Sequence, residues 1–256
     1  MTLFFFLLFS FGLIFGSFVN ALIWRLRTKQ SFMGRSMCPS CKTTILWKDL
    51  IPLLSFVLLR GTCRACHARI PWQYPFVEAS MGCLFVFIGM WHLRQSEALF
   101  FPALYRDLFI VVVLFAIFLY DLYYQEIPDL LTIPAIVILF IISLFLPGPS
   151  VFSLLLAMSI GGGIFLFQYA ISKGAWIGGG DIRLGILMGA LLGWPIILVA
   201  LFLAYVGGAL VSCCLLALKK KGLKSEVPFG TFLTVATFFS MLWGSDILAW
   251  YLHFLS

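Results

Sequence analysis

The sequence predicts an all-α polytopic membrane protein, with about eight transmembrane helices and a zinc-binding cytosolic loop after the first. The 256 residues are 62% hydrophobic and only 11% charged, whereas a soluble domain carries roughly 25% charge. Apolar runs of about 20 residues, long enough to cross a hydrocarbon core of ~30 Å, recur along the chain. The short alternating segments of a membrane β-barrel are absent from the sequence.

The apolar runs predict eight spans. They cover residues 3–23, 75–93, 105–121, 130–147, 151–171, 182–194, 196–218 and 230–251. The sixth is short and ends at "GWP", so its boundary with the seventh is the least well defined. Basic residues follow the first span instead of preceding it, which favours a permanent helix over a cleaved signal. We therefore divide the chain into a first transmembrane helix (1–23), a cytosolic loop (24–74) and a transmembrane core (75–256).

The basic residues predict the orientation of the chain. Nine of the 17 Lys and Arg residues lie in the first loop, and six more fall in later connections on the same side, including the cluster within residues 219–224. Only Arg94 and Arg106 lie opposite. The positive-inside rule then places the loop in the cytosol and both termini outside. It also accounts for the net charge of +7 without a nucleic-acid partner.

The first loop contains two C-x2-C pairs separated by 21 residues: Cys38, Cys41, Cys63 and Cys66. This spacing predicts one tetrahedral zinc, and four thiolates leave no open position, so the metal should be structural. Disulfides are disfavoured in a reducing compartment. His67 is interpreted as a bystander and Asp49 as a solvated loop residue. The apolar segment 50–59 is too short to span and should lie at the membrane interface.

Five acids lie near the cytosolic membrane boundary, and two of them suit chemistry. Asp121 ends the third span and Asp181 opens the sixth, so they share one depth. Two close carboxylates cannot both ionise easily, and such a pair can hydrolyse a peptide bond with water. Alternatively, Asp181 simply caps a helix. Asp129 fits the capping interpretation well, whereas Asp121 lies at a helix C-terminus, where negative charge is disfavoured.

Three glycines precede Asp181, namely Gly178, Gly179 and Gly180. Glycine permits tight turns and close backbone approach, so these residues are expected to let a substrate backbone reach Asp181.

Several stretches together resemble a known family. "GGGD" at 178–181 is similar to the G-x-G-D signature of membrane-embedded aspartyl proteases. With the 121–129 stretch ending in "IPD", the double CxxC loop, "GSFVN" at 16–20 and "VPFGTF" at 227–232, the chain resembles the type IV prepilin peptidases over nearly its whole length. The resemblance departs from the usual pattern at Ala21, Arg27 and Arg183, and at Thr231, where proline is common.

The resemblance implies that the core is an aspartyl protease with Asp121 and Asp181 as its catalytic pair. Such enzymes remove the basic leader of prepilins and pseudopilins at the cytosolic face of the bacterial inner membrane. Members with the cysteine-bearing loop often methylate the new N-terminal residue, using S-adenosylmethionine. The candidate residues for that cofactor are Gly16, Ser17, Asn20, Arg25 and Glu78.

Some alternatives stay open from the sequence. Glu78, an intramembrane acid, is a functional candidate by default, but it could equally form an ion pair with Arg25 or Arg69. The chain could be a peptidase without methyltransferase activity. Two other classes are a secondary transporter, although no internal symmetry is evident, and a zinc-bearing membrane scaffold without catalysis. The expected partners are prepilin or pseudopilin substrates and the lipid bilayer.

Overall fold

A computed structural model describes the chain except for residues 32, 96–99, 147, 219–226 and 256. The basic cluster within 219–224, which contributed to the predicted orientation, therefore lies outside the described residues. Contacts divide the chain into two compact units, Met1–Val112 and Val113–Ser256, and each is described by itself. The division of the chain at residues 23 and 74 stays a prediction.

Six helices in the described part of the chain are long and apolar enough to cross a membrane. They are α1 (Thr2–Thr28), α3 (Gln73–Gln95), α4 (Phe100–Tyr124), α6 (Val151–Ser172), α8 (Ile196–Ala217) and α9 (Phe229–Leu255). Two others, α5 (Asp129–Phe145) and α7 (Gly179–Leu192), have only 17 and 14 residues. Each predicted span coincides with a helix, which confirms the multi-pass α-helical class. The count of eight crossings stays a prediction.

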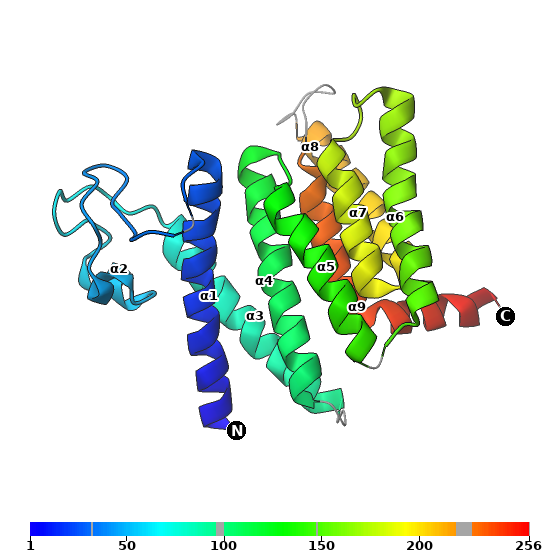
Figure 1. The fold of residues 1–256 in the computed structure, drawn as a ribbon, viewed down its shortest axis with the longest axis horizontal. Coiled ribbons are helices and arrows are strands. Elements are labelled where there is room, and N and C mark those ends of the chain that lie inside the picture. Colours follow the sequence, from blue (N-terminus) through cyan, green and yellow to red (C-terminus); the bar gives the residue numbers. More distant parts are fainter. Residues whose placement is uncertain (32, 96–99, 147, 219–226, 256) are drawn as a thin grey trace. The chain divides into compact units, whose positions relative to one another are not determined.

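In the first unit, α1 and α3 lie against each other (Figure 1). Small residues allow this close approach, as is common between membrane helices. A Cβ placed on Gly12 would lie 2.6 Å from the Cα of Gly82, and one on Gly16 would lie 2.6 Å from the Cα of Glu78. α1 also extends beyond residue 23 and ends where Lys29 adopts a left-handed conformation (φ 52°). The start of the predicted loop is therefore helical.

In the second unit, α7 packs against α5, α6 and α9 (Figure 1). A Cβ on Gly161 of α6 would lie 2.3 Å from the carbonyl oxygen of Gly185, and one on Gly189 would lie 2.4 Å from the amide nitrogen of Met158. α7 ends at Leu192, and the "GWP" sequence separates it from α8. The predicted boundary between the sixth and seventh spans is thus confirmed, and α7 is held by neighbours on several sides.

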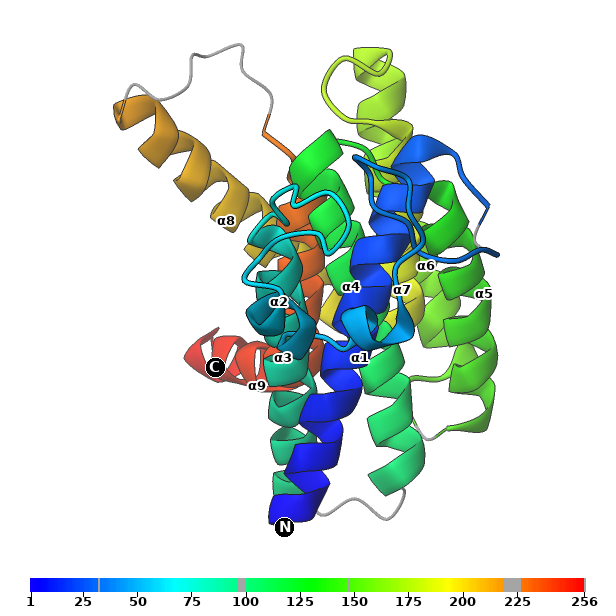
Figure 2. The ribbon, with the colours of Figure 1, turned by 90° about the vertical axis from the view of Figure 1, so that its left-hand side faces the viewer.

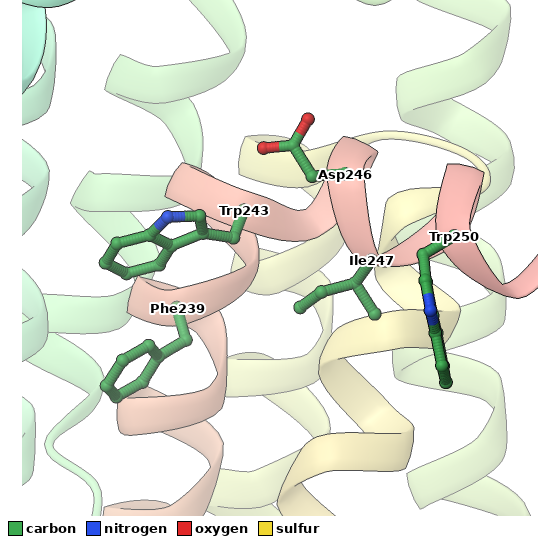
Figure 3. A pocket seen from close by; sticks show the side chains of 5 residues that line it. All are labelled: Phe239, Trp243, Asp246, Ile247 and Trp250. Atoms are coloured by element: carbon green, nitrogen blue, oxygen red, sulfur yellow. The ribbon is translucent and has the colours of Figure 1, made fainter.

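α9 changes direction toward its C-terminal end (Figures 1 and 2). Its sequence contains Gly244–Ser245, and Gly/Ser pairs are common sites of helix bends. A pocket on this part of α9 contains none of the predicted site residues. It is lined by Phe239, Trp243, Asp246, Ile247 and Trp250 (Figure 3). Aromatic side chains of this kind are typical of the membrane–water interface.

Candidate active site and metal site

The four cysteines of the first loop meet at one point. Their Sγ atoms all lie within 4.8 Å of one another, and those of Cys38 and Cys66 are 3.9 Å apart. Tetrahedral zinc with Zn–S bonds of ~2.3 Å separates its sulfur ligands by about 3.8 Å. The donor set therefore fits a zinc ion held by four thiolates.

The two cysteine pairs have the same backbone geometry, which explains how they converge. The amides of Cys38 and Cys63 donate to carbonyls five residues later, at 3.0 and 2.8 Å. The amides of Lys42 and His67, each following a second cysteine, donate back to the first cysteine's carbonyl at 2.9 Å. Lys42 and His67 both adopt left-handed φ values, 59° and 57°. His67 is thus the turn counterpart of Lys42 and lies outside the thiol cluster, in line with its interpretation as a bystander.

An ion pair closes the loop around this cluster. The guanidinium of Arg64 donates two hydrogen bonds to the carboxylate of Asp49, at 2.8 and 2.7 Å. These hydrogen bonds lower the pKa of Asp49, and its side chain is only 8% exposed. The interpretation of Asp49 as a solvated residue was wrong, because its partner lies 15 residues away in sequence.

The apolar segment 50–59 forms the short helix α2 (Leu54–Leu58) after a 3-10 turn (Trp47–Leu50). Val57 and Leu58 are 69% and 71% exposed. A short helix with exposed apolar side chains agrees with an interfacial location, which stays a prediction.

Glu78 joins this segment to the helices of the first unit. Its buried carboxylate accepts the amide N–H of Leu53 at 2.8 Å and also interacts with the Ser17 side chain. Leu53 has φ 58° and ψ −50°, and the next amide donates to the carbonyl of Pro52 at 2.6 Å. This is a γ-turn, a rare and strained conformation. Among the described residues, Glu78 therefore contacts the loop backbone and Ser17, and no ion pair with Arg25 or Arg69 is formed.

The other candidates for cofactor binding occupy different settings. Asn20 is buried, its Nδ2 donates to the carbonyl of Tyr74 at 3.2 Å, and its Oδ1 has no hydrogen-bond partner within the described chain. Arg25 donates from Nη2 to the carbonyl of Gly34 at 2.7 Å. Gly16 has a sufficient explanation in the α1–α3 contact. Of these three candidates, Asn20 is the one that offers a buried polar atom without a hydrogen-bond partner among the described residues.

Asp121 and Asp181 are both buried, 4% and 7% exposed, and both accept a hydrogen bond at a helix N-terminus. Asp121 lies in the last turn of α4, and its Oδ2 accepts the Thr231 N–H of α9 at 2.7 Å. Asp181 is the third residue of α7, and its Oδ2 accepts the Gly178 N–H at 3.0 Å. The capping interpretation left open for Asp181 thus applies to both carboxylates. Neither Oδ1 accepts a hydrogen bond from the described residues.

Ile127 packs against a glycine beside each carboxylate. A Cβ on Gly180, next to Asp181, would lie 2.7 Å from the Cβ of Ile127. A Cβ on Gly230 would lie 3.0 Å from the Cδ1 of Ile127 and 2.9 Å from the Oδ2 of Asp121. The two carboxyl groups are also close enough for the charge of Asp181 to act on Asp121. The structure therefore brings together the two acids singled out from the sequence.

The three glycines before Asp181 are not equivalent. Gly178 is the extended residue that caps α7 (φ −80°, ψ 157°), and a Cβ on Gly179 would meet nothing within 4 Å. Gly180, by contrast, is required by its contact with Ile127. Open space for an approaching backbone is thus found at Gly179, and a role in substrate approach stays a prediction.

Asp129 has a different partner from either member of this pair. Its side chain is 51% exposed, and its carboxylate pairs with Arg183 of α7. The capping role predicted for Asp129 is wrong, because the N-cap of α5 is Pro128 and no side chain caps that terminus.

The sequence did not assign roles to Gly230 or Thr231, although both belong to the quoted "VPFGTF" stretch. Phe229 anchors this start of α9, since its ring centroid lies 5.2 Å from that of Tyr205 and 6.1 Å from that of Phe165. The motif was the available signal, but the contact with Asp121 spans 110 residues.

Comparison with known proteins covers both parts of the chain. Residues 10–92 match the Bacterial Peptidase A24 N-terminal domain, and residues 108–213 match the Type IV leader peptidase family. A Bacillus subtilis (strain 168) protein named Prepilin leader peptidase/N-methyltransferase is 30% identical over 247 residues, covering 96% of this chain and 97% of that protein. No solved structure matches the chain.

Two further relatives with the same name agree. The protein from Stutzerimonas stutzeri is 31% identical over 95% of this chain and 92% of its own length. The one from Legionella pneumophila is 31% identical over 87% of this chain and 77% of its own length. The matched regions include the cysteine cluster, the Glu78 contact and both buried aspartates. The chain belongs to the type IV leader peptidase family.

Proposed function

We propose that the protein is an aspartic endopeptidase of the bacterial inner membrane that removes the basic leader from type IV prepilins or pseudopilins. We further propose that it methylates the new N-terminal residue. One observation carries the peptidase assignment: a leader peptidase family member has two buried carboxylates, each with one oxygen on a helix N-terminus, and Ile127 packs against the glycine beside each of them. A transporter or scaffold would not need this pair, and the named relatives are not of those classes.

Asp121 and Asp181 would cleave the peptide bond with water. At close range the two carboxyl groups hold one proton between them. The ionised member removes a proton from a water molecule, which attacks the scissile carbonyl carbon, while the protonated member hydrogen-bonds the carbonyl oxygen. The amide nitrogen then takes up a proton as the bond breaks, and no covalent enzyme intermediate forms. The Oδ1 atoms suit these roles, since each Oδ2 already accepts an amide N–H.

The cysteine cluster would hold zinc in a structural role. Four protein thiolates complete a tetrahedral shell, so no position remains for a reacting water. Together with the Asp49–Arg64 ion pair, the metal would fix the fold of the first loop. The Glu78–Leu53 hydrogen bond would then attach that loop to α3.

Methyl transfer would take place where Ser17, Asn20 and Glu78 gather around α1 and α3. The free acceptor Oδ1 of Asn20 supports this location, because a buried polar atom without a partner is costly unless a ligand satisfies it. S-adenosylmethionine would supply the methyl group, and the carboxylate of Glu78 suits its positive charge. The attacking α-amine exists only after cleavage, and with a pKa near ~7.7–8.0 it is partly neutral at physiological pH.

The orientation follows from the basic first loop, which supports a cytosolic active face and periplasmic termini. Leaders of the substrates are basic, and they would be presented on that same face.

The purified protein should be incubated with a prepilin and S-adenosylmethionine, and the product analysed by mass spectrometry. We expect loss of the leader and one added methyl group. Asp181→Asn should abolish leader loss but still methylate an already trimmed pilin. If a folded Asp181→Asn protein cannot methylate trimmed pilin, the two reactions share one site and the division of residues is wrong. If the wild-type protein leaves the leader in place, the peptidase proposal is wrong.

A further inference from the structure

The start of α9 is built around the side chain of Asp121. The first four amides of a helix have no partner within the helix. Thr231 is the third residue of α9, and its amide N–H donates to the Oδ2 of Asp121 at 2.7 Å in a buried setting. The same carboxylate lies at the C-terminal end of α4, where the dipole of its own helix disfavours negative charge. The amide end of α9 offsets that effect.

Gly230 and Thr231 shape the contact between α9 and Asp121. A Cβ on Gly230 would lie 2.9 Å from the Oδ2 of Asp121, so only glycine lets α9 come this close. The hydroxyl of Thr231 donates to the carbonyl of Pro228 at 2.7 Å and is therefore not the group that holds Asp121. Thr231 acts through its backbone.

We infer that the Thr231 amide is a positioning group: it stabilises the carboxylate form of Asp121 and directs the Oδ1 of Asp121 toward the reacting water. This inference rests on the proposed peptidase function. A hydrogen bond to the charged form of an acid favours that form, so loss of the Thr231 N–H should make Asp121 harder to ionise. The identity of residue 231 matters for this contact. Proline, which is common at this position in the family, has no N–H to donate.

The first test removes only the donor. Proline is tolerated in the first turn of a helix, so Thr231→Pro deletes the N–H and leaves the course of α9 intact. Thr231→Ala is the matched control, since it loses the hydroxyl but keeps the amide. The rate of prepilin cleavage should be measured between about pH 4 and pH 9. The loss of one hydrogen bond to a charged group should move the acid limb of Thr231→Pro to higher pH by about 1–2 units.

The acid limb of the pH–rate profile of Thr231→Ala should stay at the wild-type position. The inference is wrong if Thr231→Pro has the wild-type profile, or if both variants shift equally. An equal shift would mean that the side chain, and not the amide, is responsible.

A second test keeps Thr231 unchanged and needs no activity, so it separates this inference from the proposed function. Hydrogen–deuterium exchange of the peptide around Thr231 should be compared in wild type, Asp121→Ala and Asp129→Ala. We expect exchange at the Thr231 amide to become at least about tenfold faster in Asp121→Ala, because its acceptor is lost. Asp129→Ala, which removes an exposed acid, should match wild type. Unchanged exchange in Asp121→Ala would overturn the inference even if the enzyme cleaves prepilin.

Discussion

Gly161→Ala should displace the helix that carries Asp181. The new Cβ would lie 2.3 Å from the carbonyl oxygen of Gly185, whereas ordinary contacts begin at 3.4 Å. α6 and α7 would therefore have to move apart by about 1 Å, since the clash is with backbone. Gly185 lies one turn after Asp181 on α7. A misplacement of about 1 Å in a catalytic group can lower the rate about 100-fold, and we expect a loss of prepilin cleavage of that size.

Stability should change less than activity. Overpacking costs about 1–3 kcal/mol, while alanine is favoured over glycine in a helix by about 1 kcal/mol. A net loss of about 1 kcal/mol corresponds to a fall in Tm of about 2–4 °C. Gly163→Ala, two residues away, is the matched control, because its Cβ would meet nothing within 4 Å. Cleavage rates and Tm should be measured for both variants in detergent. If Gly163→Ala loses as much activity as Gly161→Ala, the packing argument is refuted.

Three further predictions concern the first unit. The purified protein should contain about one zinc per chain and Cys38→Ser should lose it; metal-free wild-type protein, purified without a chelator, would contradict this. Glu78→Ala should leave the Leu53 amide without its acceptor and make the segment around residue 53 more sensitive to limited proteolysis, whereas Glu78→Gln should keep that protection. If Glu78 also acts by its charge, Glu78→Gln should lose methylation while prepilin cleavage continues; retained methylation would assign it a purely structural role.

The sequence was sufficient for features that depend on local pattern. Hydropathy gave the positions of the helices and the break at "GWP", because burial in lipid requires continuous apolar runs. The spacing of Cys38, Cys41, Cys63 and Cys66 predicted that the four thiols converge, since each pair forms its own turn. The positions of Asp121 and Asp181 along their spans were enough to predict that the two residues lie near each other.

Features that depend on packing between distant segments could not be read in advance. Gly16 lets α1 contact α3, and its expected role in cofactor binding stays a prediction. Asp129 was expected to cap α5, but it pairs with Arg183. The contact of Thr231 with Asp121 connects two helices that are remote in sequence. It is made by a backbone amide, which the type of side chain does not reveal.

The most direct test of the account compares initial rates of prepilin cleavage for Asp121→Asn, Asp181→Asn and Asp129→Asn. Asparagine keeps the size of the side chain but removes the proton that the mechanism needs. The first two variants should lose activity by orders of magnitude while remaining folded in the membrane. Asp129→Asn should retain most of it, because that acid is half-exposed and pairs with Arg183 instead of facing a buried amide. An inactive Asp129→Asn together with an active Asp121→Asn would contradict the assignment of the catalytic pair.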